Sequence, residues 1–123
     1  MGYVPQKTKK SANRLKLVPG VYSSTVIDVY PAKGFAPGEA FTVKYQLTDG
    51  KNTYIYPETF IDDANDSRTN EFFKHLKDNG YDVDDLDSIV GMKENLTLLK
   101  QKRGRGIYLN VYDREYQGHG EVE

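Results

Sequence analysis

The sequence predicts a single, mainly β domain with one helix, and three observations favour it. The 123 residues are enough for one ordinary domain with a buried core and too few for two. Ten tyrosines and five phenylalanines argue against a disordered chain, because disordered segments are poor in aromatic residues. Several runs alternate apolar with polar side chains, which is the period of a half-buried strand.

The first strand is expected after a basic arm. Residues 1–18 contain few apolar residues and no sustained period, so we expect a flexible arm that ends at Pro19-Gly20. The run VYSSTVIDVY at 21–30 is rich in β-branched and aromatic residues, which favours a long strand. Prolines and glycines between 31 and 38 then predict a loop.

A hairpin over the next two strands is the clearest local prediction. In AFTVKYQLT, residues 40–48, apolar and polar side chains alternate without a break, as in a strand with one buried face. The Asp-Gly pair that follows predicts a tight turn, since it readily takes the φ > 0 conformations of hairpins. The third strand is expected over 53–61, with Ile55 facing inward and the tyrosines beside it facing outward. Pro57 is expected to end or distort its pairing.

One helix and two strands complete the predicted elements. Residues 67–79 form the helix, because capping residues precede them, apolar residues recur at helical spacing and an Asn-Gly pair follows. The stretch 82–91 predicts a short turn or a single helical turn. Strands are expected over 94–101 and 107–116, the second with clear alternation.

The order strand, strand, strand, helix, strand, strand is that of the OB fold, a five-stranded Greek-key barrel. We therefore expect an OB-fold domain over residues 19–116, followed by a short acidic tail at 117–123. An open α+β sheet with the same elements is the alternative, and element order alone does not separate the two.

Charged residues nearly balance in number but are segregated along the chain. There are 17 Lys and Arg against 18 Asp and Glu. Residues 1–27 carry five bases and no acid, residues 58–87 carry ten acids and three bases, and residues 88–114 carry six bases and two acids. This asymmetry is typical of a molecule with one basic face. Chance clustering of surface charges is the simpler alternative.

The composition argues against catalysis and metal binding. Without cysteine there is no disulfide, zinc ribbon, iron–sulfur site or thiol nucleophile. His75, expected on the helix surface, and His119, in a glycine-flanked tail, do not suggest a catalytic triad. The acids at 62–66 predict helix caps better than a calcium loop, whose completing positions hold Arg68 and Lys74. We expect neither an enzyme nor a cofactor or small-molecule substrate.

Membrane association is not expected either. No apolar run approaches the roughly 20 residues of a membrane span. The start MGYVPQKTKK lacks the apolar segment of a signal peptide. These features predict a cytoplasmic protein.

A binding surface remains, and the loop KQKRGRG between the last two strands is its centre. Glycines there let the backbone approach a ligand. Cations that follow phosphates, with outward aromatic rings on which bases stack, are what single-strand binding requires. In an OB barrel the ligand crosses strands two and three between the loops at either side. The predicted nucleic-acid site is Lys33, Phe35, Lys44, Tyr54, Tyr56, Lys100, Lys102, Arg103, Arg105 and Tyr108.

Other interpretations of the same residues stay open. The tyrosines are good strand formers and RGRG is compatible with an ordinary solvated hairpin tip. An OB-like protein–protein interaction module would also use a Tyr- and Arg-rich face, without binding nucleic acid. A nuclease or hydrolase accessory protein would instead hold a metal at its Asp cluster.

Two longer motifs stand out in the chain: LVPGVYSSTVIDV, with a Pro-Gly-x-Tyr opening of the first strand, and SRTNEFFKHLKDNGYDVDDLDSIVGM. They resemble those of small single-stranded-DNA-binding proteins encoded by phages, prophages and mobile elements. In the second motif Asp85, Leu86 and Gly91 stand at the family's acidic turn and glycine positions. The resemblance spans roughly residues 17–115.

This resemblance implies an OB fold and sequence-tolerant protection of single-stranded DNA during replication or recombination. The expected partner is single-stranded DNA, and self-association into a homodimer or higher oligomer is left open. The chain departs from housekeeping single-strand binders in two respects. It ends in GHGEVE without a terminal Phe, and it contains no Trp, so stacking would depend on tyrosine and Phe35.

Overall fold

The structure is a computed structural model that describes residues 17–120. Residues 1–16 of the predicted arm, with its lysines, and residues 121–123 lie outside the described residues. Within residues 17–120 the mainly β fold with one α-helix is confirmed. The elements are β1 (Gly20–Pro31), β2 (Ala40–Thr48), β3 (Thr53–Ile61), α2 (Ser67–Asp78), the 3-10 helix η1 (Leu86–Ile89), β4 (Met92–Arg103) and β5 (Gly106–His119).

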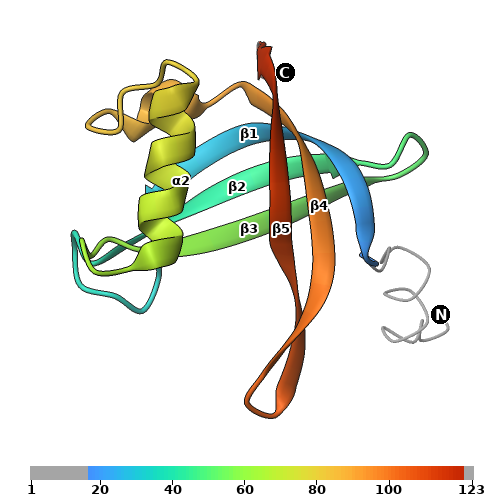
Figure 1. The fold of residues 1–123 in the computed structure, drawn as a ribbon, viewed down its shortest axis with the longest axis horizontal. Helices are drawn as coiled ribbons and strands as arrows, with labels where there is room; N and C mark the ends of the chain where they lie inside the picture. Colours follow the sequence, from blue (N-terminus) through green and yellow to red (C-terminus); the bar gives the residue numbers. More distant parts are fainter. Residues whose placement is uncertain (1–16, 121–123) are drawn as a thin grey trace, which may run out of the picture.

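The strands form one antiparallel sheet in the order β3-β2-β1-β4-β5. Figure 1 shows β4 and β5 crossing in front of β1, β2 and β3, with α2 to one side. The prediction of a closed barrel is wrong, because within residues 17–120 no backbone ladder joins β3 to β5. The two edge strands are linked by side chains instead, since the Tyr56 hydroxyl donates to the Leu109 carbonyl at 2.9 Å.

The free edge of β3 explains why a proline fits within this strand. The carbonyls of Thr59 and Ile61 point away from β2, because they accept from Arg68 Nη1 and Thr69 Oγ1, each at 2.7 Å. Pro57 lies two residues before Thr59, so its backbone groups also face away from β2. The N–H that proline lacks would therefore make no bond to β2, as is usual for proline on an edge strand. Contrary to the sequence prediction, β3 continues in unbroken register through this residue.

The core lies between the inner face of the sheet and α2. On β2 the alternate residues Phe41 to Leu47 are buried, which confirms the predicted strand. Phe72 of α2 stacks on Phe60 of β3 with ring centroids 4.3 Å apart, so the helix is fixed to the sheet by aromatic packing. The predicted start of the helix is also confirmed, because the Asp66 side chain accepts from the Thr69 N–H at 2.9 Å.

The predicted side-chain directions on β3 are wrong. The register pairs Leu47 with Tyr54 and Tyr45 with Tyr56. Residues directly opposite each other in a sheet share a face, so both β3 tyrosines point to the core side. Ile55, expected to face inward, lies on the outer face and is 54% exposed.

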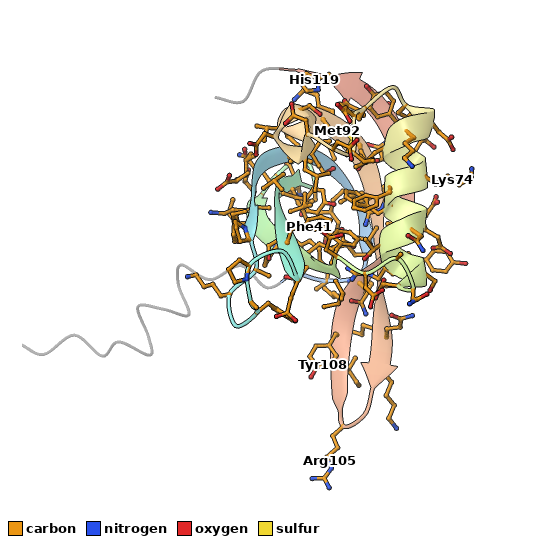
Figure 2. All side chains as sticks on the ribbon, turned by 90° about the vertical axis from the view of Figure 1, so that its left-hand side faces the viewer. Phe41, Lys74, Met92, Arg105, Tyr108 and His119 are labelled. Carbon is orange, nitrogen blue, oxygen red and sulfur yellow. The ribbon has the colours of Figure 1, made fainter. Side chains whose placement is uncertain are left out.

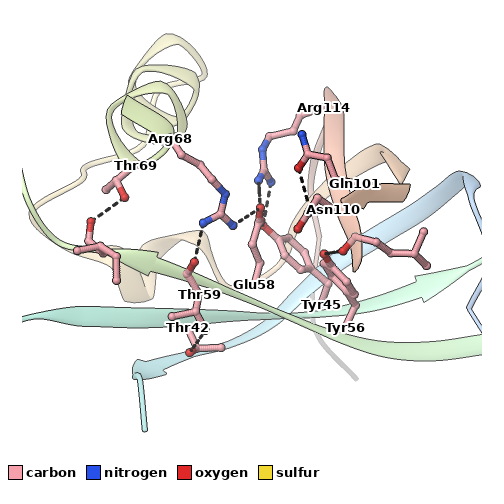
Figure 3. Close-up of polar contacts among 12 residues, drawn as sticks. Thr42, Tyr45, Tyr56, Glu58, Thr59, Arg68, Thr69, Gln101, Asn110 and Arg114 are labelled. Atoms are coloured by element: carbon pink, nitrogen blue, oxygen red, sulfur yellow. Dashed lines mark hydrogen bonds and ion pairs between the residues drawn. The ribbon is translucent and has the colours of Figure 1, made fainter. Parts of the chain in front are cut away.

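A buried ionic cluster holds β5 against β3 (Figure 3). The Glu58 carboxylate of β3 accepts two bonds from Arg114 Nη2 of β5, at 2.6 and 2.7 Å. The Tyr45 hydroxyl donates to the same carboxylate at 2.8 Å, and Arg68 Nη2 donates to it at 3.0 Å. The guanidinium of Arg114 also lies 4.8 Å from the Phe72 ring centroid. This cluster takes the place of backbone pairing between β3 and β5.

The cluster continues to α2 through a second buried acid. Glu94 of β4 contacts His75 Nε2, and one of its oxygens lies 3.9 Å from Arg114 Nη1. The expectation of a surface histidine is therefore wrong, because His75 is half-buried and paired with a fully buried carboxylate. Burial raises the pKa of the Tyr45 hydroxyl well above its ordinary value, so this group stays a hydrogen-bond donor.

Gly91, between η1 and β4, is expected to tolerate no side chain. Its φ is +100°, and an added Cβ would collide with the Gly120 carbonyl oxygen and lie 2.8 Å from His119 Nε2. Because of this collision, we expect Gly91→Ala to lower the unfolding free energy by about 1–3 kcal/mol more than an alanine at another glycine of positive φ, measured by urea denaturation. The control is Gly38→Ala, at φ +82° with nothing within 4 Å of the added Cβ. Equal losses in the two variants would contradict the collision.

Candidate nucleic-acid interface

The structure places the ten predicted site residues in four regions. The hairpin formed by the ends of β4 and β5 carries half of them, and the β1–β2 loop carries two. One lies on the outer face of β2, and two lie on the core side of β3. The hairpin residues are Lys100, Lys102, Arg103, Arg105 and Tyr108, and the loop residues are Lys33 and Phe35. The β2 residue is Lys44, and the β3 residues are Tyr54 and Tyr56.

The β4–β5 hairpin projects away from the rest of the molecule, with Arg105 at its tip (Figure 2). Arg103 pairs with Gly106 across a two-residue turn, and Gly104 at its first position has φ +57°. Glycine at that position suits the type II′ turns that fit twisted hairpins. Residues 95–112 contain four cations and no acid. The hairpin is therefore a positively charged projection.

The two faces of this hairpin carry different side chains. Cross-strand pairing sets Lys102 opposite Ile107 and Lys100 opposite Leu109, which gives one face lysines and aliphatic residues. It sets Gln101 opposite Tyr108 on the other face. The β5 side of the hairpin is the open edge of the sheet. A ligand that follows this edge meets cations on one side and an aromatic ring on the other.

The ring of Tyr108 lies against the backbone of a glycine two residues earlier. A Cβ built at Gly106 would lie 2.5 Å from the Tyr108 hydroxyl and 2.6 Å from its ring carbons. The ring therefore covers the bare backbone of Gly106 with part of its surface. The side chain is nonetheless 55% exposed. This is the geometry of an aromatic platform that offers surface to a stacking partner.

A cavity of about 630 Å³ opens beside Tyr108, between the unpaired edges of β3 and β5. A second cavity of about 400 Å³ lies next to it, between α2 and β5. Glu58, Arg68 and Asn110 line both, so the two cavities adjoin. Neither follows from the sequence pattern, because both depend on the missing β3–β5 ladder.

The predicted site residues of the β1–β2 loop and of β2 do not line either cavity beside the hairpin. Lys33 and Phe35 are exposed in the loop, which Figure 1 shows near the lower end of α2 and apart from the hairpin tip. Lys44 lies on the outer face of β2, between Asp28 on β1 and Pro57 on β3. It does not share a face with Tyr54 and Tyr56, although the predicted site groups the three residues.

Tyr54 and Tyr56 are positioned for packing rather than for outward stacking. The Tyr54 ring packs edge-on against Tyr22, with ring centroids 5.8 Å apart. Tyr56 is half-buried, and burial raises the pKa of its hydroxyl to about 12. Its O–H donates to a β5 carbonyl, as described above. Of the two, only Tyr56 reaches a candidate site, as part of the wall of the larger cavity.

Sequence reasoning missed several exposed or polar residues near the hairpin. Ile107 and Tyr112 are 69% and 74% exposed, and Asn110 donates to Gln101 Oε1 at 2.8 Å within the smaller cavity. Tyr112 has the same parity as Tyr108 along the strand but is not among the predicted site residues, and the bulge between Asp113 and Val111 falls at Tyr112. The apolar alternation of residues 107–111 predicts that Ile107 is buried, so its exposure could not be seen from the pattern.

Comparisons with protein-family models, with curated proteins and with solved structures find no match for this chain. Among residues 17–120, no group of three or more His, Asp or Glu side chains is arranged to hold a metal ion. In the same range, no helix has the length and apolarity needed to cross a membrane.

Proposed function

We propose that this protein binds single-stranded DNA without reading its sequence, as a non-catalytic protein of replication or recombination. The observation that carries the proposal is the projecting β4–β5 hairpin, which has four cations, no acid and an exposed tyrosine platform. We further propose that the sheet is an open form of the OB fold. Two features support this: β1 pairs with both β2 and β4, and the helix lies between β3 and β4.

The two faces of the hairpin match the two sides of an unpaired strand. A single strand carries its phosphates on one side and its bases on the other, so it can follow the free edge of β5 with both sides engaged. The phosphates then meet Lys100 and Lys102, and the bases meet Tyr108. Stacking is worth about 1–3 kcal/mol per base and is tolerant of sequence, because every base has a π-face.

Titration of the protein with a fluorescent thymidine oligonucleotide tests this function. Fluorescence anisotropy is followed at about 50 and about 200 mM salt, with a duplex of the same length as the control. We expect tight binding to the single strand, weakened by salt, and weaker binding to the duplex. No binding at low salt would refute the proposal and favour a protein–protein interaction through the same hairpin.

Tyr108→Ala is expected to weaken single-strand binding by about fivefold to a hundredfold, which corresponds to the loss of one stacked base. The slope of log K against log salt should stay unchanged, since no charge is removed. The matched control is Tyr112→Ala, which removes another exposed tyrosine of β5 from outside the larger cavity. A steep loss in the control with none in Tyr108→Ala would place the stacking ring elsewhere.

A further inference from the structure

The larger cavity is bounded by the two strand edges that lack a backbone ladder. Residues 56–59 of β3 form one wall, residues 108–110 of β5 form the other, and Arg68 of α2 lies at the side. Its volume of about 630 Å³ falls within the range of small-molecule sites in proteins. It also adjoins the aromatic platform of the hairpin, so a base leaving that platform enters it directly.

The cavity walls offer both hydrogen-bond donors and acceptors. Asn110 Nδ2 donates one bond, to Gln101 Oε1 at 2.8 Å, which leaves its second N–H and its amide oxygen for a ligand. The Tyr56 hydroxyl donates to Leu109, so its oxygen remains an acceptor. Because the amide carries both kinds of group, it can pair with the edge of any base.

The electrostatics of the cavity favour a neutral group over a phosphate. The one carboxylate that lines it within residues 17–120, Glu58, is neutralised by Arg114 and Arg68. Arg68 is itself engaged, since its two terminal nitrogens donate to Glu58 and to the Thr59 carbonyl. Among the residues that the structure describes, no cation other than Arg68 lines the cavity, so an uncharged, planar ligand suits it better than an anion.

We propose that this cavity holds one nucleobase of the bound single strand, between Tyr108 and the edge of β3. The inference rests on the proposed DNA binding and adds a specific place for a base. Tyr108 and Pro57 provide apolar contact surface, and Asn110 with Tyr56 provides hydrogen bonds to the edge of the base. The phosphates on either side of this base stay outside, toward the lysine face of the hairpin.

Photocrosslinking locates the base in the intact protein. A thymidine oligonucleotide containing 5-iododeoxyuridine is bound and irradiated, and the modified peptide is identified by mass spectrometry. We expect the adduct on Tyr108 or Tyr56. Binding with all adducts on residues outside this cavity would overturn the cavity proposal and leave DNA binding intact. Absence of binding would overturn both.

A variant pair tests the same cavity by affinity. Asn110→Ala removes the side-chain amide from the cavity, and Asn95→Ala removes the same group from the far end of β4, where it lines a separate cavity. We expect Asn110→Ala to weaken binding of a thymidine oligonucleotide about fivefold, as for one lost hydrogen bond, and Asn95→Ala to leave it unchanged. With an abasic oligonucleotide, Asn110→Ala should have no effect. Equal losses with both oligonucleotides would contradict a base in the cavity.

Discussion

Replacing Arg114 with methionine is expected to cost about 3–5 kcal/mol of unfolding free energy. The variant leaves Glu58 buried with only the partly exposed Arg68 as its cation, and it leaves Glu94 with only His75. An uncompensated buried charge is what makes removal of one partner so costly. Urea denaturation followed by circular dichroism measures the loss.

The control for Arg114→Met is Lys74→Met, which breaks the exposed pair of Lys74 with Asp78 on α2. Exposed helix pairs contribute only about 0.3–0.5 kcal/mol, so this variant should be nearly as stable as the wild type. If Arg114→Met lost no more stability than the control, the ionic cluster would not be what holds β5 against β3. A second variant, Glu58→Gln with Arg114→Met, should recover part of the loss, because it also removes the buried negative charge.

Removing the hairpin cations is expected to have the largest effect on DNA binding. In the combined variant of Lys100→Ala, Lys102→Ala and Arg105→Ala, the slope of log K against log salt should fall by about 2, at about 0.7 per lost phosphate contact. Between about 50 and about 200 mM salt the wild type should therefore lose roughly twentyfold more affinity than the variant. Anisotropy titrations over this salt range measure both slopes.

A second triple variant that removes the same number of charges from elsewhere tests whether the hairpin, rather than the overall charge of the molecule, causes the salt dependence. Lys51→Ala, Lys74→Ala and Lys77→Ala together remove three exposed lysines from the β2–β3 turn and from α2. Its slope should match that of the wild type, because these lysines lie outside the hairpin. Equal slopes for the two triple variants would mean that attraction is diffuse and that the hairpin is not the binding site.

Element positions could be predicted from the sequence because their signals are local. The unbroken alternation of 40–48 reproduces β2, and the capping residues before Ser67 place the start of α2. The strands β4 and β5 are longer than predicted, since the charged hairpin residues interrupt the apolar pattern but not the pairing. In this region backbone hydrogen bonds, rather than burial, maintain the strands.

The directions of Tyr54 and Tyr56 were predictable but were predicted wrongly. All residues of TYIYPE before the proline are strand formers, so alternation gives no preferred face. The preferred face follows from the turn, because residues 49–52 form a four-residue connection that sets Thr48 opposite Thr53 and Leu47 opposite Tyr54. Because Leu47 faces the core, Tyr54 must do so as well. Hairpin register was the signal to use.

The ionic cluster and the cavities could not be read from the sequence. Glu58 and Arg114 are 56 positions apart, and a charged residue in a strand ordinarily indicates a solvent-facing position. Their burial depends on two edge strands that meet without a backbone ladder. The same missing ladder creates the cavity beside Tyr108, so that part of the site appears only in three dimensions.

The most direct test of the central claim, that the projecting hairpin is the DNA-binding surface, is an NMR titration of the isotope-labelled protein with a thymidine oligonucleotide. We predict that the largest backbone amide shifts fall within residues 99–112, with smaller shifts in the β1–β2 loop. Saturable binding with shifts confined to the outer face of β1 and β2, around Ser23 and Gln46, would contradict it.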